Sequence, residues 1–147
     1  EKFYIEAFGE YAKRLGAYCH LEVAELTEIR LSDRPSEAEI AAALDKEADL
    51  VVKNIPQGSY VVALCVEGKK LSSEDLAAVI CARENSGKPK LCFVIGSSYG
   101  LSEKIKHAAD LRLSMSDMTF PHHLARVMLA EQIYRGFKIN EGSSYHK

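Results

Sequence analysis

Two short apolar runs rich in valine most constrain how this chain can fold. Residues 60–66 read Tyr-Val-Val-Ala-Leu-Cys-Val, and residues 91–95 read Leu-Cys-Phe-Val-Ile. Nearly continuous apolar strands of this kind are buried on both faces, as in a parallel sheet with helices on each side. The two runs therefore predict an α/β fold with a mostly parallel sheet.

The segments around these runs alternate between helical and extended patterns. Ser36 and Glu39 form a capping-box pair, which predicts a helix start, and Gly16 is placed to end the first helix in a left-handed conformation. Pro121 suits the first turn of a long final helix. The expected helices are 4–15, 37–55, one from Ser72 or Ser73 to near Gly87, a short one around Ile105, and one from Pro121 to about Phe137. Besides the two valine-rich runs, strands are expected at 20–24 and 111–113.

Composition limits the class of protein. With 147 residues, 47% of them hydrophobic, the chain can bury one core, so we expect a single domain over 1–147. The net charge of −2 argues against a broad positive surface, so any RNA contact must be local. The four cysteines form no C-x-x-C pair, and we expect neither a metal site nor disulfides. No apolar run reaches the roughly 18 residues of a membrane span, and no leader pattern is present, which indicates the cytoplasm.

Three segments follow predicted strands and carry ligand-binding potential. The first strand leads into Gly68 and Lys69, the second into the loop 96–100, which reads Gly-Ser-Ser-Tyr-Gly, and the third into the segment 114–122. In open parallel sheets, ligands collect beyond the carboxyl ends of the strands, where glycines allow close approach to the backbone. Glycines after strands are also common in plain turns, so the first two segments alone are weak signals.

The third segment makes the pattern specific. Residues 113–122 read Leu-Ser-Met-Ser-Asp-Met-Thr-Phe-Pro-His, residues 130–135 read Ala-Glu-Gln-Ile-Tyr-Arg, and the chain ends Tyr145-His146-Lys147. In order and spacing, residues 64–147 resemble the RlmH family of large-subunit pseudouridine N3-methyltransferases, which belong to the SPOUT class. The helix near Tyr11 also resembles that family. Two departures are Ser97, where the family usually has a second glycine, and the absence of a short first strand before the first helix.

The resemblance implies a SPOUT-type α/β knot, a trefoil in which the C-terminal segment threads a loop and forms the pocket for S-adenosylmethionine. It also implies a homodimer and a 23S ribosomal RNA or ribosome partner. The final helix is apolar around more of its circumference than one packing face needs, which independently suggests burial against its own sheet and against a second subunit. The cofactor residues that the resemblance implies are Leu64, Gly96, Gly100, Met115, Ser116, Asp117, Met118, Thr119 and Phe120.

The target nitrogen of a pseudouridine carries a proton that must be removed during methyl transfer. His146 and Glu131 are the candidate acceptors. RNA contacts are expected from His122, Arg126, Arg135, Tyr145 and His146. Simpler alternatives are that the arginines are solvated or paired with Glu131, and that the tail is disordered.

Two other functions stay open at this point. A non-catalytic ribosome-binding or RNA-binding module could keep the fold without the cofactor, and Ser97 is its main support. A Rossmann-type nucleotide enzyme is disfavoured because no G-x-G-x-x-G follows a strand and opens a helix.

Overall fold

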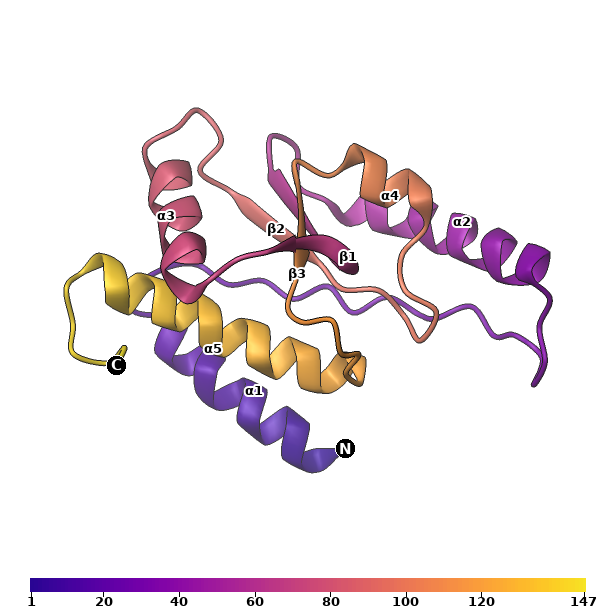
Figure 1. The fold of residues 1–147 in the computed structure, drawn as a ribbon, viewed down its shortest axis with the longest axis horizontal. Coiled ribbons are helices and arrows are strands. Elements are labelled where there is room, and N and C mark those ends of the chain that lie inside the picture. The colour runs from indigo at the N-terminus through magenta and orange to yellow at the C-terminus, as the bar shows by residue number, and fades with distance from the viewer.

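The computed structural model describes residues 1–147 as five helices and three strands (Figure 1). The three strands form one sheet in the order β2-β1-β3, and both outer strands run parallel to β1. The predicted α/β class with a parallel sheet is therefore confirmed. The elements are α1 (Lys2–Leu15), α2 (Glu37–Asn54), β1 (Tyr60–Lys70), α3 (Ser73–Glu84), β2 (Leu91–Val94), α4 (Glu103–Ala108), β3 (Leu111–Ser114) and α5 (His122–Asn140).

The central strand β1 is longer than its apolar run predicts, extending to Lys70 instead of Val66. Leu64 of β1 pairs with Leu113 of β3. The register then shifts, so that Lys69 of β1 pairs with the same Leu113. Gly68 allows this irregularity, because a Cβ atom there would lie 2.8 Å from the Arg112 carbonyl. A glycine inside a strand pattern is the usual mark of such a close backbone approach.

Capping side chains begin the two middle helices as the sequence predicts. The Ser36 hydroxyl accepts a hydrogen bond from the Glu39 amide (3.1 Å), and the Glu39 carboxylate accepts one from the Ser36 amide (3.2 Å). Of the two serines considered for α3, Ser72 is the cap, and it forms the same reciprocal pair with Asp75. Each cap satisfies amides that the helix itself leaves unpaired.

The helices lie on two sides of the sheet. In Figure 1, α2 and α4 lie together on one side, while α5 and α1 lie together on the other. The core on the α2 side combines Ala48, Ala63, Val94, Leu101 and Ile105. On the other side α3 and α5 approach closely, since a Cβ atom on Gly136 would lie 2.7 Å from Ile80 Cδ1.

Two local predictions are wrong. Residues 20–24 form no strand, and Leu21 and Val23 are exposed. An alternating pattern becomes a strand only where a neighbouring strand pairs with it, and residues 20–24 pair with neither of the outer strands, β2 and β3. Gly16 is right-handed, with φ −56°, because its amide still bonds to carbonyls of the last turn of α1 and the chain continues into a turn at Tyr18.

The apolar circumference of α5 has an explanation within the chain. Helices α1 and α3 both pack along α5, and its buried residues are Leu129, Ala130 and Gly136. The large exposed apolar side chains in this region lie instead on α1, at Phe3 and Ile5. None of the helices combines the length and hydropathy needed to cross a membrane. The threading of the C-terminal segment stays a prediction.

Candidate active site

The ends of β2 and β3 are in register with the middle of β1, close to Leu64, and β1 continues beyond them to Lys70. Ala63 pairs with Val94 on β2, and Leu64 pairs with Leu113 on β3. Gly96 lies two residues beyond Val94, and Met115 lies two residues beyond Leu113. The register therefore brings the predicted cofactor residues of all three segments to the same level of the sheet, as expected for parallel strands.

The loop 96–100 after β2 is a tight turn. The Gly100 amide donates to the Ser97 carbonyl (2.9 Å), and Gly100 has a φ of +87°, which favours glycine. A Cβ atom on Gly96 would overlap the Gly100 carbonyl and lie 3.0 Å from its Cα. Ser97 does not take a positive φ. Ser97 therefore fits this turn without the backbone strain that a positive φ would cause.

The loop 115–120 after β3 is held by its own polar side chains and by β1. The Ser116 hydroxyl accepts a hydrogen bond from the Met118 amide (3.0 Å), and the Ser114 hydroxyl donates to the Ser116 carbonyl (3.1 Å). Lys70, at the end of β1, pairs with Asp117 at 2.6 Å. The loop is thus ordered, yet Met118 is 73% exposed.

Strand β1 and the loops after β2 and β3 each expose one large apolar side chain. These are Val66 on β1 (45% exposed), Tyr99 in the loop 96–100 (46%) and Met118 in the loop 115–120 (73%). In parallel sheets ligands bind beyond the carboxyl ends of the strands, so these side chains are candidates for contact with a ligand. Phe120 is half-buried at the end of the third segment.

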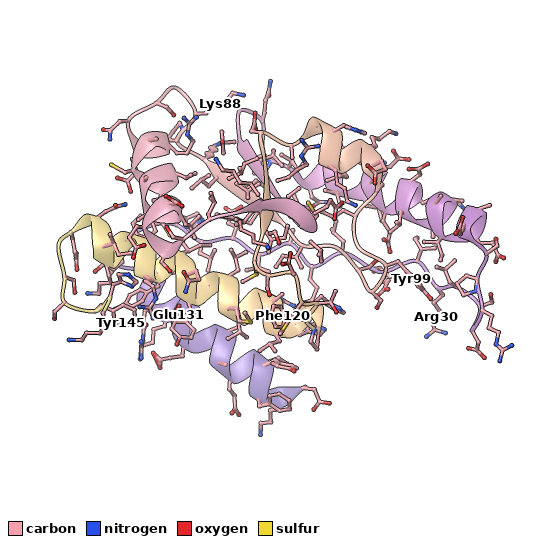
Figure 2. The ribbon with its side chains drawn as sticks, in the orientation of Figure 1. Arg30, Lys88, Tyr99, Phe120, Glu131 and Tyr145 are labelled. Carbon is pink, nitrogen blue, oxygen red and sulfur yellow. The ribbon has the colours of Figure 1, made fainter.

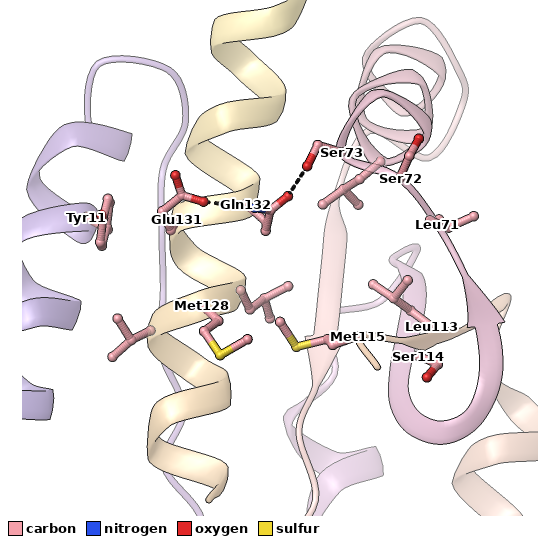
Figure 3. A pocket seen from close by; sticks show the side chains of 13 residues that line it. Tyr11, Leu71, Ser72, Ser73, Leu113, Ser114, Met115, Met128, Glu131 and Gln132 are labelled. Carbon is pink, nitrogen blue, oxygen red and sulfur yellow. Dashed lines mark hydrogen bonds between the residues drawn. The ribbon is translucent and has the colours of Figure 1, made fainter. Parts of the chain in front are cut away.

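A cavity of about 550 Å³ lies between α1, α3, α5 and the end of β3 (Figure 3). Among the predicted site residues it includes Met115 and Glu131, whereas Leu64, Gly96 and Gly100 lie outside it. Figure 3 shows a polar chain on its wall: Ser73 donates to the Gln132 side-chain oxygen (2.6 Å), and Gln132 donates to Glu131 (2.9 Å). Residues of the segment after β3 and the predicted catalytic residue Glu131 therefore line the same cavity.

The C-terminal tail folds back onto α5 and α3. The Tyr145 hydroxyl donates to Glu131 Oε2 (2.8 Å), and Arg135 donates to the same carboxylate (2.6 Å) and to His146 Nδ1 (3.1 Å). The second ring nitrogen of His146 bonds to Glu74. Because arginine can only donate, Nδ1 accepts and the ring proton lies on Nε2, facing Glu74. Four predicted residues, Glu131, Arg135, Tyr145 and His146, are thus brought together, and Figure 2 shows Tyr145 close to Glu131.

This cluster changes the proton affinity of its members. Burial raises the pKa of Glu131, but hydrogen bonds from Arg135, Tyr145 and Gln132 outweigh it, and the pKa is lowered. Burial and the hydrogen bond to Glu131 raise the pKa of Tyr145 to about 12. The hydrogen bond from His146 lowers the pKa of Glu74. Glu131 is therefore ionised, and each of its two oxygens accepts hydrogen bonds from neighbouring side chains.

His122 and Arg126 lie at the other end of α5, apart from this cluster. Arg126 pairs with Glu25 at 3.4 Å, contacts His123 Nδ1 at 3.3 Å, and lies over the Phe8 ring. The His122 and His123 rings lie 4.2 Å apart. Of the two arginines for which pairing with Glu131 was an alternative, Arg135 makes that pair and Arg126 does not.

Three residues of this region were not assigned a role from the sequence: Glu74, Gln132 and Tyr11. Glu74 reaches His146 across 72 residues, and Gln132 reaches Ser73 across 59. Tyr11 lies on α1 and lines the same cavity. Gln132 and Tyr11 lie in segments that resemble the family, and this resemblance is the signal that could have identified them.

Comparison with known proteins gives one family. The family described as "Predicted SPOUT methyltransferase" matches residues 1–146. The Ribosomal RNA large subunit methyltransferase H of Clostridioides difficile is 44% identical over 147 residues, which is 100% of this chain and 92% of that protein. The proteins of the same name from Clostridium botulinum and Acetivibrio thermocellus are 45% and 44% identical, with the same coverage.

Proposed function

The chain belongs to the SPOUT methyltransferase family, and from that premise we propose that it methylates N3 of a pseudouridine in 23S ribosomal RNA, with S-adenosylmethionine as the methyl donor. The relatives named ribosomal RNA large subunit methyltransferase H support the RNA substrate, because they match the whole of this chain at 44–45% identity. The resemblance of residues 64–147 to the RlmH pattern supports the choice of nucleotide. A ribosomal substrate also supports a cytoplasmic location.

The observation that carries the proposal is the carboxyl edge of the sheet. Strand β1 exposes Val66, and the loops that follow its parallel neighbours β2 and β3 expose Tyr99 and Met118. Beside them, the turn from Gly96 to Gly100 is too tight for any side chain at Gly96. An adenine ring needs apolar faces and a close backbone, so this edge fits the adenosine part of the cofactor.

We assign the cofactor to the three segments at this edge. The residues that would hold it are Leu64, Gly96, Gly100, Met115, Ser116, Asp117, Met118, Thr119 and Phe120. The Met118 amide is bonded to the Ser116 hydroxyl. That hydroxyl must rotate away if the amide is to bind the adenine edge. When bound, the cofactor supplies an electrophilic methyl group on a sulfonium sulfur.

The residues of the chain then have to position the base and accept its proton. Glu131 is a poor acceptor, because its carboxylate is held ionised by four hydrogen bonds from three side chains. His146 is the better candidate, since only the Arg135 hydrogen bond covers Nδ1. In this proposal Arg135 turns towards the RNA phosphate and leaves His146 Nδ1 free. Nδ1 then accepts the proton from N3 of the base, while Glu131 keeps the tail in place.

The RNA-binding residues support a homodimer. His122 and Arg135 are 13 positions apart on α5, or about 20 Å at 1.5 Å per residue. Such a separation is too long for both ends to contact one nucleotide. If two copies packed with α1 and α5 of one copy antiparallel to those of the other, the Arg135, Tyr145 and His146 cluster of one copy would lie near His122 and Arg126 of the other. The two ends would then complete one RNA site.

The test is methyl transfer from radiolabelled S-adenosylmethionine to large-subunit RNA, both free and in ribosomes, followed by mass spectrometry of the nucleosides. N3-methylpseudouridine in 23S RNA is the expected product. Calorimetry with S-adenosylmethionine separates the alternative: a non-catalytic module would bind ribosomes and give no heat with the cofactor.

A further inference from the structure

A carboxylate on α2 connects the loop 96–100 to the extended segment before α2. Glu47 Oε1 accepts a hydrogen bond from the Ser97 hydroxyl at 3.0 Å, across 50 residues of sequence. Its other oxygen, Oε2, accepts one from the Ile29 amide at 2.9 Å. The neighbouring Glu28 accepts a hydrogen bond from the Ser98 amide at 3.3 Å. Two successive loop residues are therefore held from outside the loop.

Glu47 belongs to a part of α2 that packs against the hydrophobic core. Ala48, next to Glu47, is almost completely buried in the core with Ala63 and Val94. Val51, one turn further along the same face of α2, packs against that core. The core also contains Leu101, directly after the loop. Both ends of the Glu47 to Ser97 hydrogen bond are thus attached to the same packed unit.

The hydrogen-bond partners of Glu47 indicate a specific role. Glu47 is half-buried, and no lysine, arginine or histidine lies within ion-pair distance. Each of its oxygens instead accepts from an uncharged donor. Partial burial of a carboxylate without a cation is costly, so its contacts must offset that cost. Hydrogen bonds to a charged acceptor are the stronger kind, and here both order segments that have no helix or strand of their own.

We propose that Glu47 is a positioning residue that holds the loop 96–100 in the conformation that receives the cofactor. It acts through the Ser97 hydroxyl on one side and the Ile29 amide on the other. The inference rests on the proposed function, since it takes this loop as part of the cofactor site. Ser97 is the residue that departs from the family glycine, and a glycine could not make this bond. The departure therefore adds an attachment for the loop.

The experiment compares four single variants of the full chain: Glu47→Ala, Glu47→Gln, Ser97→Gly and the control Asp45→Ala. Asp45 is exposed on the same helix and has no ion pair. Three quantities are measured: the Kd for S-adenosylmethionine by calorimetry, methyl transfer at saturating cofactor, and hydrogen exchange of the Gly100 amide. That amide bonds to the Ser97 carbonyl and reports on the loop without any ligand.

Glu47→Ala should weaken cofactor binding about tenfold, accelerate Gly100 exchange at least about fivefold, and leave transfer at saturating cofactor within about twofold. Glu47→Gln should recover most of the affinity, because its carbonyl can accept from Ile29 while its amide donates to the Ser97 oxygen. Ser97→Gly should bind S-adenosylmethionine about threefold more weakly, and Asp45→Ala should bind it as tightly as the wild type. Unchanged affinity and exchange in Glu47→Ala would overturn the proposal, as would equal losses in Asp45→Ala.

The two hypotheses fail in different ways. If the wild-type protein binds no S-adenosylmethionine, the proposed function fails, and the exchange measurement still decides whether Glu47 holds the loop. If the wild type binds and Glu47→Ala binds equally well, the proposed function stands and Glu47 has no positioning role.

Discussion

Tyr145 donates a 2.8 Å hydrogen bond to Glu131, which fixes the third residue from the C-terminus to the middle of α5. Arg135 donates to the same carboxylate and lies over the Tyr145 ring, 4.9 Å from its centre. A tail that composition alone would describe as disordered is thus bound by charge-assisted hydrogen bonds and a cation–π contact. Its order depends on the ionised state of Glu131.

The first prediction concerns pH. The folded-state pKa of Glu131 is lowered, so its contribution to stability is present above the unfolded-state value of about 4.3 and is lost as pH falls through the lower folded value. Glu131→Gln should cost about 1–2 kcal/mol in the free energy of unfolding at pH 7, and this difference should shrink below about pH 4. Urea denaturation at both pH values measures it.

Glu6→Gln is the matched control, because it removes one negative charge from an exposed carboxylate on α1 that has no ion pair. It should leave stability unchanged at either pH. A Glu131→Gln difference that is the same at pH 7 and pH 3.5 would show that the ionised form of Glu131 does not stabilise the fold.

A second prediction concerns the turn after β2. Gly96→Val should abolish binding of S-adenosylmethionine, because even a methyl group at Gly96 would overlap the Gly100 backbone. Gly87→Val is the control, since a Cβ atom there meets no atom within 4 Å and the position has no positive φ. Calorimetry should give wild-type affinity for Gly87→Val and no heat for Gly96→Val. If wild type and Gly96→Val both give no heat, the assignment as an enzyme is in serious difficulty.

Local patterns were sufficient to predict most of the fold. The valine-rich runs predicted β1 and β2, and the Ser36–Glu39 pair predicted the start of α2, because burial and capping depend on residues close in sequence. The strand expected at 20–24 fails because pairing is a tertiary event that an alternating pattern does not determine. The prediction of a left-handed Gly16 fails in the same way, since the chain path after α1 decides its conformation, which is right-handed.

The candidate site could be predicted only in part. Met115 to Phe120 and the tail were identified by resemblance to a family. The contacts that organise them were not predicted: Glu74 with His146, Lys70 with Asp117, and Glu47 with Ser97. The partners in these pairs are 72, 47 and 50 residues apart, and each is an ordinary polar residue in its local context. No periodicity or spacing connects such partners.

A third prediction concerns assembly. Phe3 and Ile5 are 59% and 72% exposed on α1, which packs along α5, and such apolar side chains favour a covered surface. We expect light scattering at micromolar concentration to give twice the 16.3 kDa chain mass. Ile5→Glu should weaken the dimer, whereas Glu6→Gln should not. A monomeric mass for the wild type would contradict the dimer and, with it, the two-copy RNA site.

The last prediction separates cofactor binding from methyl transfer. Deletion of residues 145–147 removes Tyr145 and His146, whose partners are Glu131, Arg135 and Glu74, and none of these lies in the loops 96–100 or 115–120. The Kd for S-adenosylmethionine should therefore stay nearly unchanged. Transfer to ribosomal RNA should fall at least about tenfold, equivalent to about 1.4 kcal/mol of transition-state stabilisation, because Tyr145 can stack on a splayed base and His146 can accept the proton.

Removal of Lys147 alone is the control for shortening the chain, since this exposed residue has no hydrogen-bond partner or ion pair in the structure. It should retain activity to within about threefold, as expected for the loss of one exposed charge. The transferase activity of Tyr145→Phe should lie between those of the control and the full deletion. The ring stays available for stacking, while the hydrogen bond to Glu131 is lost. Full transferase activity after deletion of 145–147 would mean that the docked tail stabilises α5 and takes no part in the reaction.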